Sequence, residues 1–188
     1  MKNSRQGFSL LELMITLSLA GTAFFAIAAV IRASTGFYKV SSGNMDIEGR
    51  GSRTLHQIAD ILRGTELDSI AALPQAPLSD TALLYQTVEP YAGQSTSTSD
   101  PTRLTMQAGS VVRTDSFLLP DERTKVLLQG VPDFFEGETF NGVDDNGNGF
   151  VDEPGMFFAR EGSTIIIGLT LLDGETTRSW TTRVVCRN

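Results

Sequence analysis

The hydrophobic pattern divides the chain into an apolar N-terminal run, an amphipathic stretch and a half with strand periodicity. Between residues 8 and 31 the only ionisable side chain is Glu12. As an α-helix, the charge-free part from 13 to 31 is about as long as the hydrocarbon core of a bilayer is thick. Lys2 and Arg5 precede it, which places the N-terminus on the cytoplasmic side. The pattern predicts a helix that crosses a membrane once, with everything after Arg32 outside.

Beyond the apolar run, apolar residues recur at spacings of three and four, which predicts an amphipathic continuation of the same helix. These residues are Leu55, Ile58, Ile61 and Leu62. Gly64 suits a C-cap, and Arg63 is favourable in the last turn. We therefore predict one helix over residues 8–63. Four glycines between residues 36 and 51 weaken it by about 1 kcal/mol each relative to alanine, so we expect some bending or fraying there.

The rest of the chain shows strand patterns separated by turn residues. A connection over residues 65–101 contains one strand pattern and a polar, Ser/Thr-rich loop at 93–101. The segments predicted as strands are 82–88, 102–107, 110–118, 125–135, 156–160, 164–172 and 177–187. Asp173-Gly174-Glu175 predicts a hairpin turn, and the apolar segment 164–172 predicts a central strand. A helix followed by antiparallel strands predicts an α+β fold with the helix laid across a sheet.

From the residues alone, three interpretations of the N-terminal run stay open. A secretory signal peptide also begins with a basic leader, and Ala26-Ile27-Ala28 offers a cleavage site, but this apolar run is longer than usual for that class. A plain signal anchor accommodates the length. It gives no reason to keep Glu12, which costs roughly 2.5–3.5 kcal/mol at mid-membrane depth and less near the end. Alternatively, Glu12 pairs with a positive charge of another chain or of a newly made N-terminus.

The segment from Gly7 to Leu13, GFSLLEL, resembles the processing site of type IV pilins and type II secretion pseudopilins. The resemblance implies that a prepilin peptidase cuts after Gly7 and that Phe8 becomes N-methylated. It also implies that Glu12 pairs with the terminal amine of a neighbouring subunit during assembly. The chain then has a removed leader at 1–7 and a transmembrane or filament-core helix at 8–35. Residues 36–188 hold the amphipathic half of the helix and a globular β-rich domain.

Three shorter segments are similar to PilW-like minor pilins and J-type pseudopilins, at residues 58–63, 125–134 and 181–188. This resemblance implies a pilin-like fold and a subunit that primes or caps a type IV pilus or type II secretion pseudopilus. The expected location is the bacterial inner membrane, with one span and a periplasmic domain, and then the filament, which can reach the cell surface. The expected partners are other pilins or pseudopilins and the prepilin peptidase. The alternative is a membrane-anchored, calcium-dependent adhesin or binding module that does not polymerise.

A loop at residues 141–155 has the alternation of oxygen-bearing side chains that suits Ca²⁺. Compared with an EF-hand loop, the candidate ligands at positions 1, 3, 5, 7 and 9 are Asp144, Asn146, Asn148, the Phe150 carbonyl and Asp152. Position 12 is Gly155, so Glu153 or a distant carboxylate has to replace the usual glutamate. Glu136 and Glu138 are expected to lie in a solvated approach to the loop. The alternative is an ordinary Asn/Gly/Asp-rich turn between strands.

Net charge limits the kinds of partner that we expect, and the absence of catalytic motifs argues against most enzyme classes. The formal charge of −7 becomes −9 without Lys2 and Arg5, because 13 basic residues then face 22 acidic ones. An acidic exterior argues against nucleic acid as a direct partner. The sequence has no P-loop, dinucleotide-binding, zinc-protease or nucleophile-elbow motif, so we expect no enzyme. The single histidine, His56, is expected on the surface or in packing, and the single cysteine, Cys186, as a buried apolar residue of the last strand.

Overall fold

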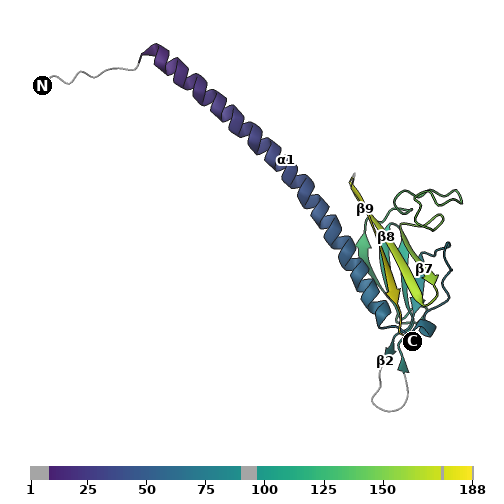
Figure 1. Ribbon diagram of the computed structural model, residues 1–188. Coiled ribbons are helices and arrows are strands. Elements are labelled where there is room, and N and C mark those ends of the chain that lie inside the picture. The colour runs from purple at the N-terminus through teal and green to yellow at the C-terminus, as the bar shows by residue number, and fades with distance from the viewer. Residues whose placement is uncertain (1–8, 90–96, 175, 188) are drawn as a thin grey trace. The chain divides into compact units, whose positions relative to one another are not determined.

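The computed structural model describes residues 9–89, 97–174 and 176–187, which form one helix, a short 3₁₀ turn and nine strands (Figure 1). The chain divides into two compact units, Met1–Met45 and Asp46–Asn188. In the described part of the first unit, the regular structure is the N-terminal portion of helix α1. The second unit holds the last turns of that helix and all the strands.

Helix α1, Leu10–Arg63, is continuous over 54 residues. The Ser9 hydroxyl accepts the backbone N–H of Glu12 at 3.2 Å, which is how an N-cap residue begins a helix. At the other end, the Gly64 N–H donates to the carbonyls of Asp60 and Ile61, so the predicted C-cap is confirmed. The backbone stays helical through all four glycines. The fraying expected there does not occur.

The strands form two main antiparallel sheets and a small ribbon. The first sheet has the order β1-β4-β5-β6, the second has the order β7-β8-β9, and β2 pairs only with β3. The bounds are β1 Ala82–Tyr85, β2 Val88–Glu89, β3 Ser97–Thr98, β4 Thr102–Gln107, β5 Ser110–Asp115, β6 Arg123–Gln129, β7 Met156–Glu161, β8 Thr164–Asp173 and β9 Thr176–Val185; the 3₁₀ turn η1 is Leu67–Ser69. The α+β class predicted from the sequence is confirmed, although its strands are divided between sheets.

Backbone conformation explains where the predicted strands were too long. The strand expected over 110–118 ends at Asp115, because Ser116 and Leu118 both have positive φ angles. The strand expected over 125–135 ends at Gln129, because Gly130 has a φ of +89° and Pro132 has no N–H for a ladder. The segment 82–88 is split between β1 and β2. Local turn geometry ends the first two of these segments before the apolar pattern does.

The main core lies between the last turns of α1 and the two sheets. Ile47, Leu55, Ile58, Ala59 and Leu62 are the buried apolar residues of the helix, and Ile61 packs against them while half-buried. Four alternate residues of β8 meet the same core, namely Ile165, Ile167, Leu169 and Leu171. The predicted helix face and the central position of β8 are both confirmed. His56 is exposed, with its ring Nδ1 2.7 Å from the Ser52 carbonyl oxygen.

The opposite face of β8 supports a second, smaller apolar cluster. Ile166 of β8 joins Phe157 and Ala159 of β7 and two aromatic rings from the loop region, Phe135 and Phe150. Phe157 lies edge-on to Phe135, with ring centroids 5.4 Å apart. Strand β8 is therefore covered on both sides, which explains its unbroken apolar sequence in an antiparallel sheet.

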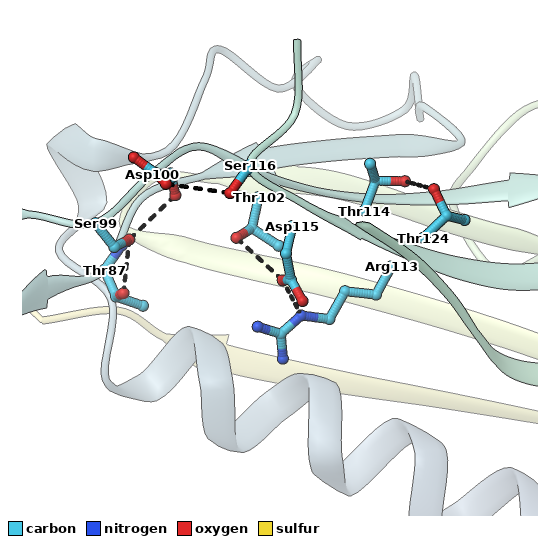
Figure 2. Close-up of polar contacts among 9 residues, drawn as sticks. All are labelled: Thr87, Ser99, Asp100, Thr102, Arg113, Thr114, Asp115, Ser116 and Thr124. Atoms are coloured by element: carbon cyan, nitrogen blue, oxygen red, sulfur yellow. Dashed lines mark hydrogen bonds and ion pairs between the residues drawn. The ribbon is translucent and has the colours of Figure 1, made fainter. Parts of the chain in front are cut away.

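A polar network holds the return of the chain from the Ser/Thr-rich loop onto the first sheet (Figure 2). The Thr87 hydroxyl donates to the Ser99 hydroxyl at 2.8 Å, and the Ser116 hydroxyl donates to Asp100 at 3.1 Å. Within β5, Arg113 pairs with Asp115 at 2.7 Å. Residues 90–96, which make up the first part of the predicted loop, lie outside the described residues. The described remainder is anchored through its side chains.

Cys186 is buried, as the sequence predicted, although it lies directly after β9 rather than within it. Burial raises the pKa of its thiol, and the charge of Arg160 lowers it by a smaller amount. A thiol that is buried and held protonated packs as a small apolar group and reacts slowly.

Two helix glycines should respond oppositely to alanine. A Cβ at Gly51 would lie 2.3 Å from the Trp180 ring, whereas the nearest atom to a Cβ at Gly49 is 3.8 Å away. Gly51→Ala should lower the free energy of unfolding by about 1–3 kcal/mol through overpacking. Gly49→Ala should raise it by up to about 1 kcal/mol through helix propensity. Thermal or denaturant unfolding of both variants measures this, and equal shifts would show that Gly51 is not needed for the contact.

Candidate functional site

The N-terminal part of α1 presents apolar side chains on every side. The described residues from Leu10 to Tyr38 are all exposed in their unit. By length and composition, α1 contains a window that could cross a membrane, and none of that window is buried within the chain. Large apolar groups such as Phe24 and Phe25 are 74% and 81% exposed. A surface of this kind needs lipid or other helices around it.

Glu12 lies in the first turn of this helix. Its backbone N–H is capped by Ser9, as described above. Within the part of the chain that the structure describes, its carboxylate has no ion pair. Gly7 and Phe8, the two predicted processing residues, lie outside the described residues. The structure therefore places Glu12 on the exposed apolar segment and leaves the cleavage position to the sequence.

The loop between β6 and β7 is folded around side chains that accept backbone N–H groups. The Asp144 carboxylate accepts three of them, from Gly147 at 2.6 Å, Asn148 at 3.1 Å and Gly149 at 2.8 Å. The Asn146 side-chain oxygen Oδ1 accepts the Asn148 N–H at 3.0 Å, and the Asn148 side-chain oxygen Oδ1 accepts the Phe150 N–H at 2.9 Å. The alternation of residue types thus builds a series of Asx-type turns. Such turns order the loop through its own hydrogen bonds.

Asp152 joins the two ends of this loop. One of its oxygens accepts the N–H groups of Asn141 at 2.7 Å and Gly142 at 2.9 Å, eleven and ten residues earlier. Its φ angle is +53°, a left-handed conformation that asparagine and aspartate tolerate better than most residues. Asp152, the predicted ligand at position 9, therefore closes the loop through hydrogen bonds to its first residues.

Phe150, the predicted seventh ligand, has two separate functions in the fold. Its ring is only 5% exposed and lies 5.1 Å from the Phe157 ring, which anchors the loop to the second apolar cluster. Its N–H is held by Asn148. The aromatic residue fixes where the loop sits, and its backbone carbonyl remains the predicted ligand group.

Glu153 and Glu138 are buried together, which the sequence did not predict. Glu153 is 0% exposed and Glu138 is 6% exposed, so the expected solvated position of Glu138 is wrong. Desolvation raises the pKa of Glu153, the hydrogen bond from the Asn148 amide lowers it, and the nearby charge and side chain of Glu138 raise it again. The sequence carries no signal for the burial of Glu138, because its neighbours, Gly137 and Thr139, belong to no apolar periodic pattern.

Exposed Asp145 behaves differently from this buried pair. Hydrogen bonds from Thr139 and Asn141 lower the pKa of Asp145, and they keep its carboxylate ionised beside water. Over the described residues, no three His, Cys, Asp or Glu side chains converge as a metal-binding group. Any cation would therefore rely on amide and backbone oxygens as well as carboxylates, which calcium accepts readily.

A long apolar N-terminal helix packed through its later turns on antiparallel sheets is a pilin-like α+β arrangement. Residues 2–28 match the family model described as the prokaryotic N-terminal methylation motif. This match confirms the resemblance to the type IV pilin and pseudopilin superfamily at the N-terminus, where the motif implies peptidase processing and assembly with other pilins. The motif marks a structural rather than a catalytic class. No curated protein and no solved structure matches the chain.

Asp152 offers a test of how the loop is closed. Asp152→Asn keeps an oxygen acceptor and tolerates the positive φ, so it should change the free energy of unfolding in chelator by less than about 0.5 kcal/mol. Asp152→Ala removes the acceptor for two N–H groups and should cost about 1–3 kcal/mol. Hydrogen exchange at the amides of Asn141 and Gly142 should accelerate only in Asp152→Ala. Protection that survives in that variant would contradict the closing role.

Proposed function

We propose that this chain is a minor subunit of a type IV pilus or of a type II secretion pseudopilus, which it joins through the N-terminal half of α1. The observation that carries the proposal is an exposed apolar helix segment with one acid, Glu12, inside the matched N-terminal methylation motif at residues 2–28. In lipid that acid is unfavourable unless a cation compensates it. The new terminal amine of a neighbouring subunit is such a cation, and it exists only after leader removal.

The subunit starts as a single-pass protein of the inner membrane with Lys2 and Arg5 in the cytoplasm. The unit Asp46–Asn188 lies in the periplasm at this stage. Cleavage after Gly7 by the prepilin peptidase and methylation of Phe8 follow from the resemblance. The helix then moves from lipid into the filament, where other apolar helices replace the lipid contacts. Van der Waals packing and the Glu12 pair favour the filament.

A priming or tip position fits the globular unit better than a repeating one. A major subunit must repeat the same contacts along the whole fibre, whereas a priming subunit makes most of its contacts once. The similarity of residues 125–134 and 181–188 to PilW-like and J-type subunits supports this position. In the structure these residues form parts of β6 and β9.

The proposal includes calcium in the loop at 141–155. The candidate ligands are Asp144, Asn146, Asn148, Phe150, Asp152 and Glu153, and buried carboxylate oxygens without a partner support a cation there. Bound calcium would neutralise part of the local negative charge and would be coordinated by oxygen atoms from both ends of the loop. The loop's own hydrogen bonds already order it, so the ion would add stability to a formed loop rather than create it.

Leader removal and assembly should be separable by mutation. Gly7→Leu should block cleavage, because a bulky side chain replaces the glycine that the resemblance places in the peptidase site. Glu12→Gln should be cleaved normally but enter filaments several-fold less often, because the neighbour's amine loses its partner. Mass spectrometry of the N-terminus and quantification in sheared filaments measure the two steps.

The matched control for that pair is Ser9→Ala, which removes the helix cap but keeps the Glu12 charge. It should be recruited like the unaltered chain. Recruitment of Glu12→Gln at the normal level would remove the pairing role, and an intact Met1 in purified material would favour a simple membrane anchor.

Copy number provides a separate test of the minor-subunit assignment. A priming or tip subunit should form a small minority of the protein in sheared filaments, because each filament needs few copies. Quantitative mass spectrometry with labelled reference peptides from this chain and from the dominant subunit measures the ratio. An abundance equal to that of the dominant subunit would contradict a priming role while leaving filament entry intact.

A further inference from the structure

Two buried glutamates meet where the ends of the loop come together. The segment before the loop pairs with the segment after it, since the Phe135 N–H donates to the Glu153 carbonyl at 2.9 Å and Phe134 forms a bridge with Pro154. This pairing brings Glu138 from one side and Glu153 from the other under the loop. Both side chains are more than nine-tenths buried.

Each carboxylate has one satisfied oxygen and one unsatisfied oxygen. Glu138 Oε1 accepts the N–H groups of Asp145 and Asn146, both at 3.0 Å. Glu153 Oε1 accepts the side-chain amide of Asn148. The second oxygens, Glu138 Oε2 and Glu153 Oε2, are inaccessible to solvent and have no hydrogen-bond donor among the described residues. Buried polar atoms without a partner are rare, and each one calls for a missing proton, water or ion.

A cation, or a proton shared between the two neighbouring carboxyl groups, would satisfy these oxygens, and only the cation compensates both charges. Two neighbouring carboxylates out of water repel each other and lose hydration, and this combination is costly unless a positive charge lies between them. No lysine or arginine of the described residues makes an ion pair with either glutamate, and the ion pairs found there involve other acids. The atoms that lack partners are oxygens, which are the ligands of hard divalent cations.

We propose that Glu138 and Glu153 are the anchoring ligands of a Ca²⁺ site at the base of the loop, with Glu138 replacing the glutamate that an EF-hand has at its twelfth position. This inference rests on the calcium part of the proposed function, and it moves the main ligands from the loop to the two buried glutamates. Loop carbonyl and amide oxygens and water complete the shell. Calcium accepts six to eight such ligands in flexible geometry, whereas magnesium requires a stricter octahedron.

The predicted first ligand, Asp144, serves a different purpose in this arrangement. Its two oxygens accept three backbone N–H groups of the loop, and it is only half-buried. It therefore shapes the loop whether or not an ion is bound. The two glutamates, in contrast, each keep an oxygen that nothing in the described chain satisfies. Ion binding there would tie the residue before the loop to the residue after it.

Calcium titration of the full-length chain in detergent, after treatment with chelator, tests the site. Calorimetry with CaCl₂ up to about 10 mM, above the weak range of extracellular sites, gives the Kd, and thermal unfolding is followed with CaCl₂ and with chelator. Glu138→Gln and Glu153→Gln should each raise the Kd about tenfold or more. The matched control is Glu136→Gln, two residues away and exposed, which should bind like the unaltered chain.

The melting temperatures separate a ligand from a merely structural group. Glu138→Gln keeps an oxygen for the Asp145 and Asn146 N–H groups and removes one of two neighbouring charges. It should therefore melt at the same or a higher temperature than the unaltered chain in chelator, and at a lower temperature in calcium. A structural glutamate would lower the melting temperature in both conditions. If Glu138→Gln does not fold, the same comparison with Glu153→Gln decides the outcome.

Two results would overturn the inference in distinguishable ways. Calcium binding by the unaltered chain with an unchanged Kd in both glutamine variants would reject the pair and leave a calcium loop of another ligand set. No binding and no calcium-dependent melting in the unaltered chain would reject both the pair and the calcium part of the proposed function. Neither result bears on filament entry, which the Glu12 variants test separately.

Discussion

Burial of β8 on both faces is the constraint on which the globular unit depends. One face holds Ile165, Ile167, Leu169 and Leu171 against the last turns of α1, and the other face carries Ile166 beneath the loop. Fully burying such side chains contributes roughly 1.5–3 kcal/mol each. Gly168 belongs to the same arrangement, because a Cβ there would lie 2.0 Å from the Phe157 ring. The helix, the sheets and the loop are thus positioned by a single strand.

The two halves of α1 bury their apolar groups by different means. The later turns use an amphipathic stripe that the sheets cover, so their stability comes from within the chain. The earlier turns have no such cover and are exposed on all sides in their unit. They need lipid before assembly and neighbouring helices after it. A single helix can therefore be both a stable part of the globular unit and an interface that another molecule completes.

The loop at 141–155 follows a similar division between satisfied and unsatisfied groups. Asp144, Asn146 and Asp152 satisfy the backbone of the loop itself, and Phe150 attaches it to the aromatic cluster. Glu138 and Glu153 retain unsatisfied oxygens in a buried place. Polar groups that find hydrogen-bond partners within the chain fix the conformation of the loop. Polar or charged groups that lack a partner indicate where a ligand or another subunit binds. Glu12 in the helix and the glutamate pair in the loop are both of the second kind.

The sequence by itself determined the elements whose signals are local. The apolar run with Glu12, the amphipathic stripe ending at Gly64 and the alternation from Asp144 to Asp152 all depend on periodicity or motif, and each has its place in the structure. Strand ends at Asp115 and Gln129 differed from prediction, because positive φ angles are set by turns rather than by hydrophobic pattern.

Only the tertiary structure decided the burial of Glu138 and its meeting with Glu153. Glu138 lies in a polar, glycine-containing segment, which by pattern belongs on the surface. It becomes buried because pairing of Phe134 with Pro154 draws two distant segments together over the second apolar cluster. Contacts between residues far apart in the chain leave no periodic trace at either one. Local spacing therefore specifies the helix, the strands and the turns, while long-range packing specifies which acids lose their water.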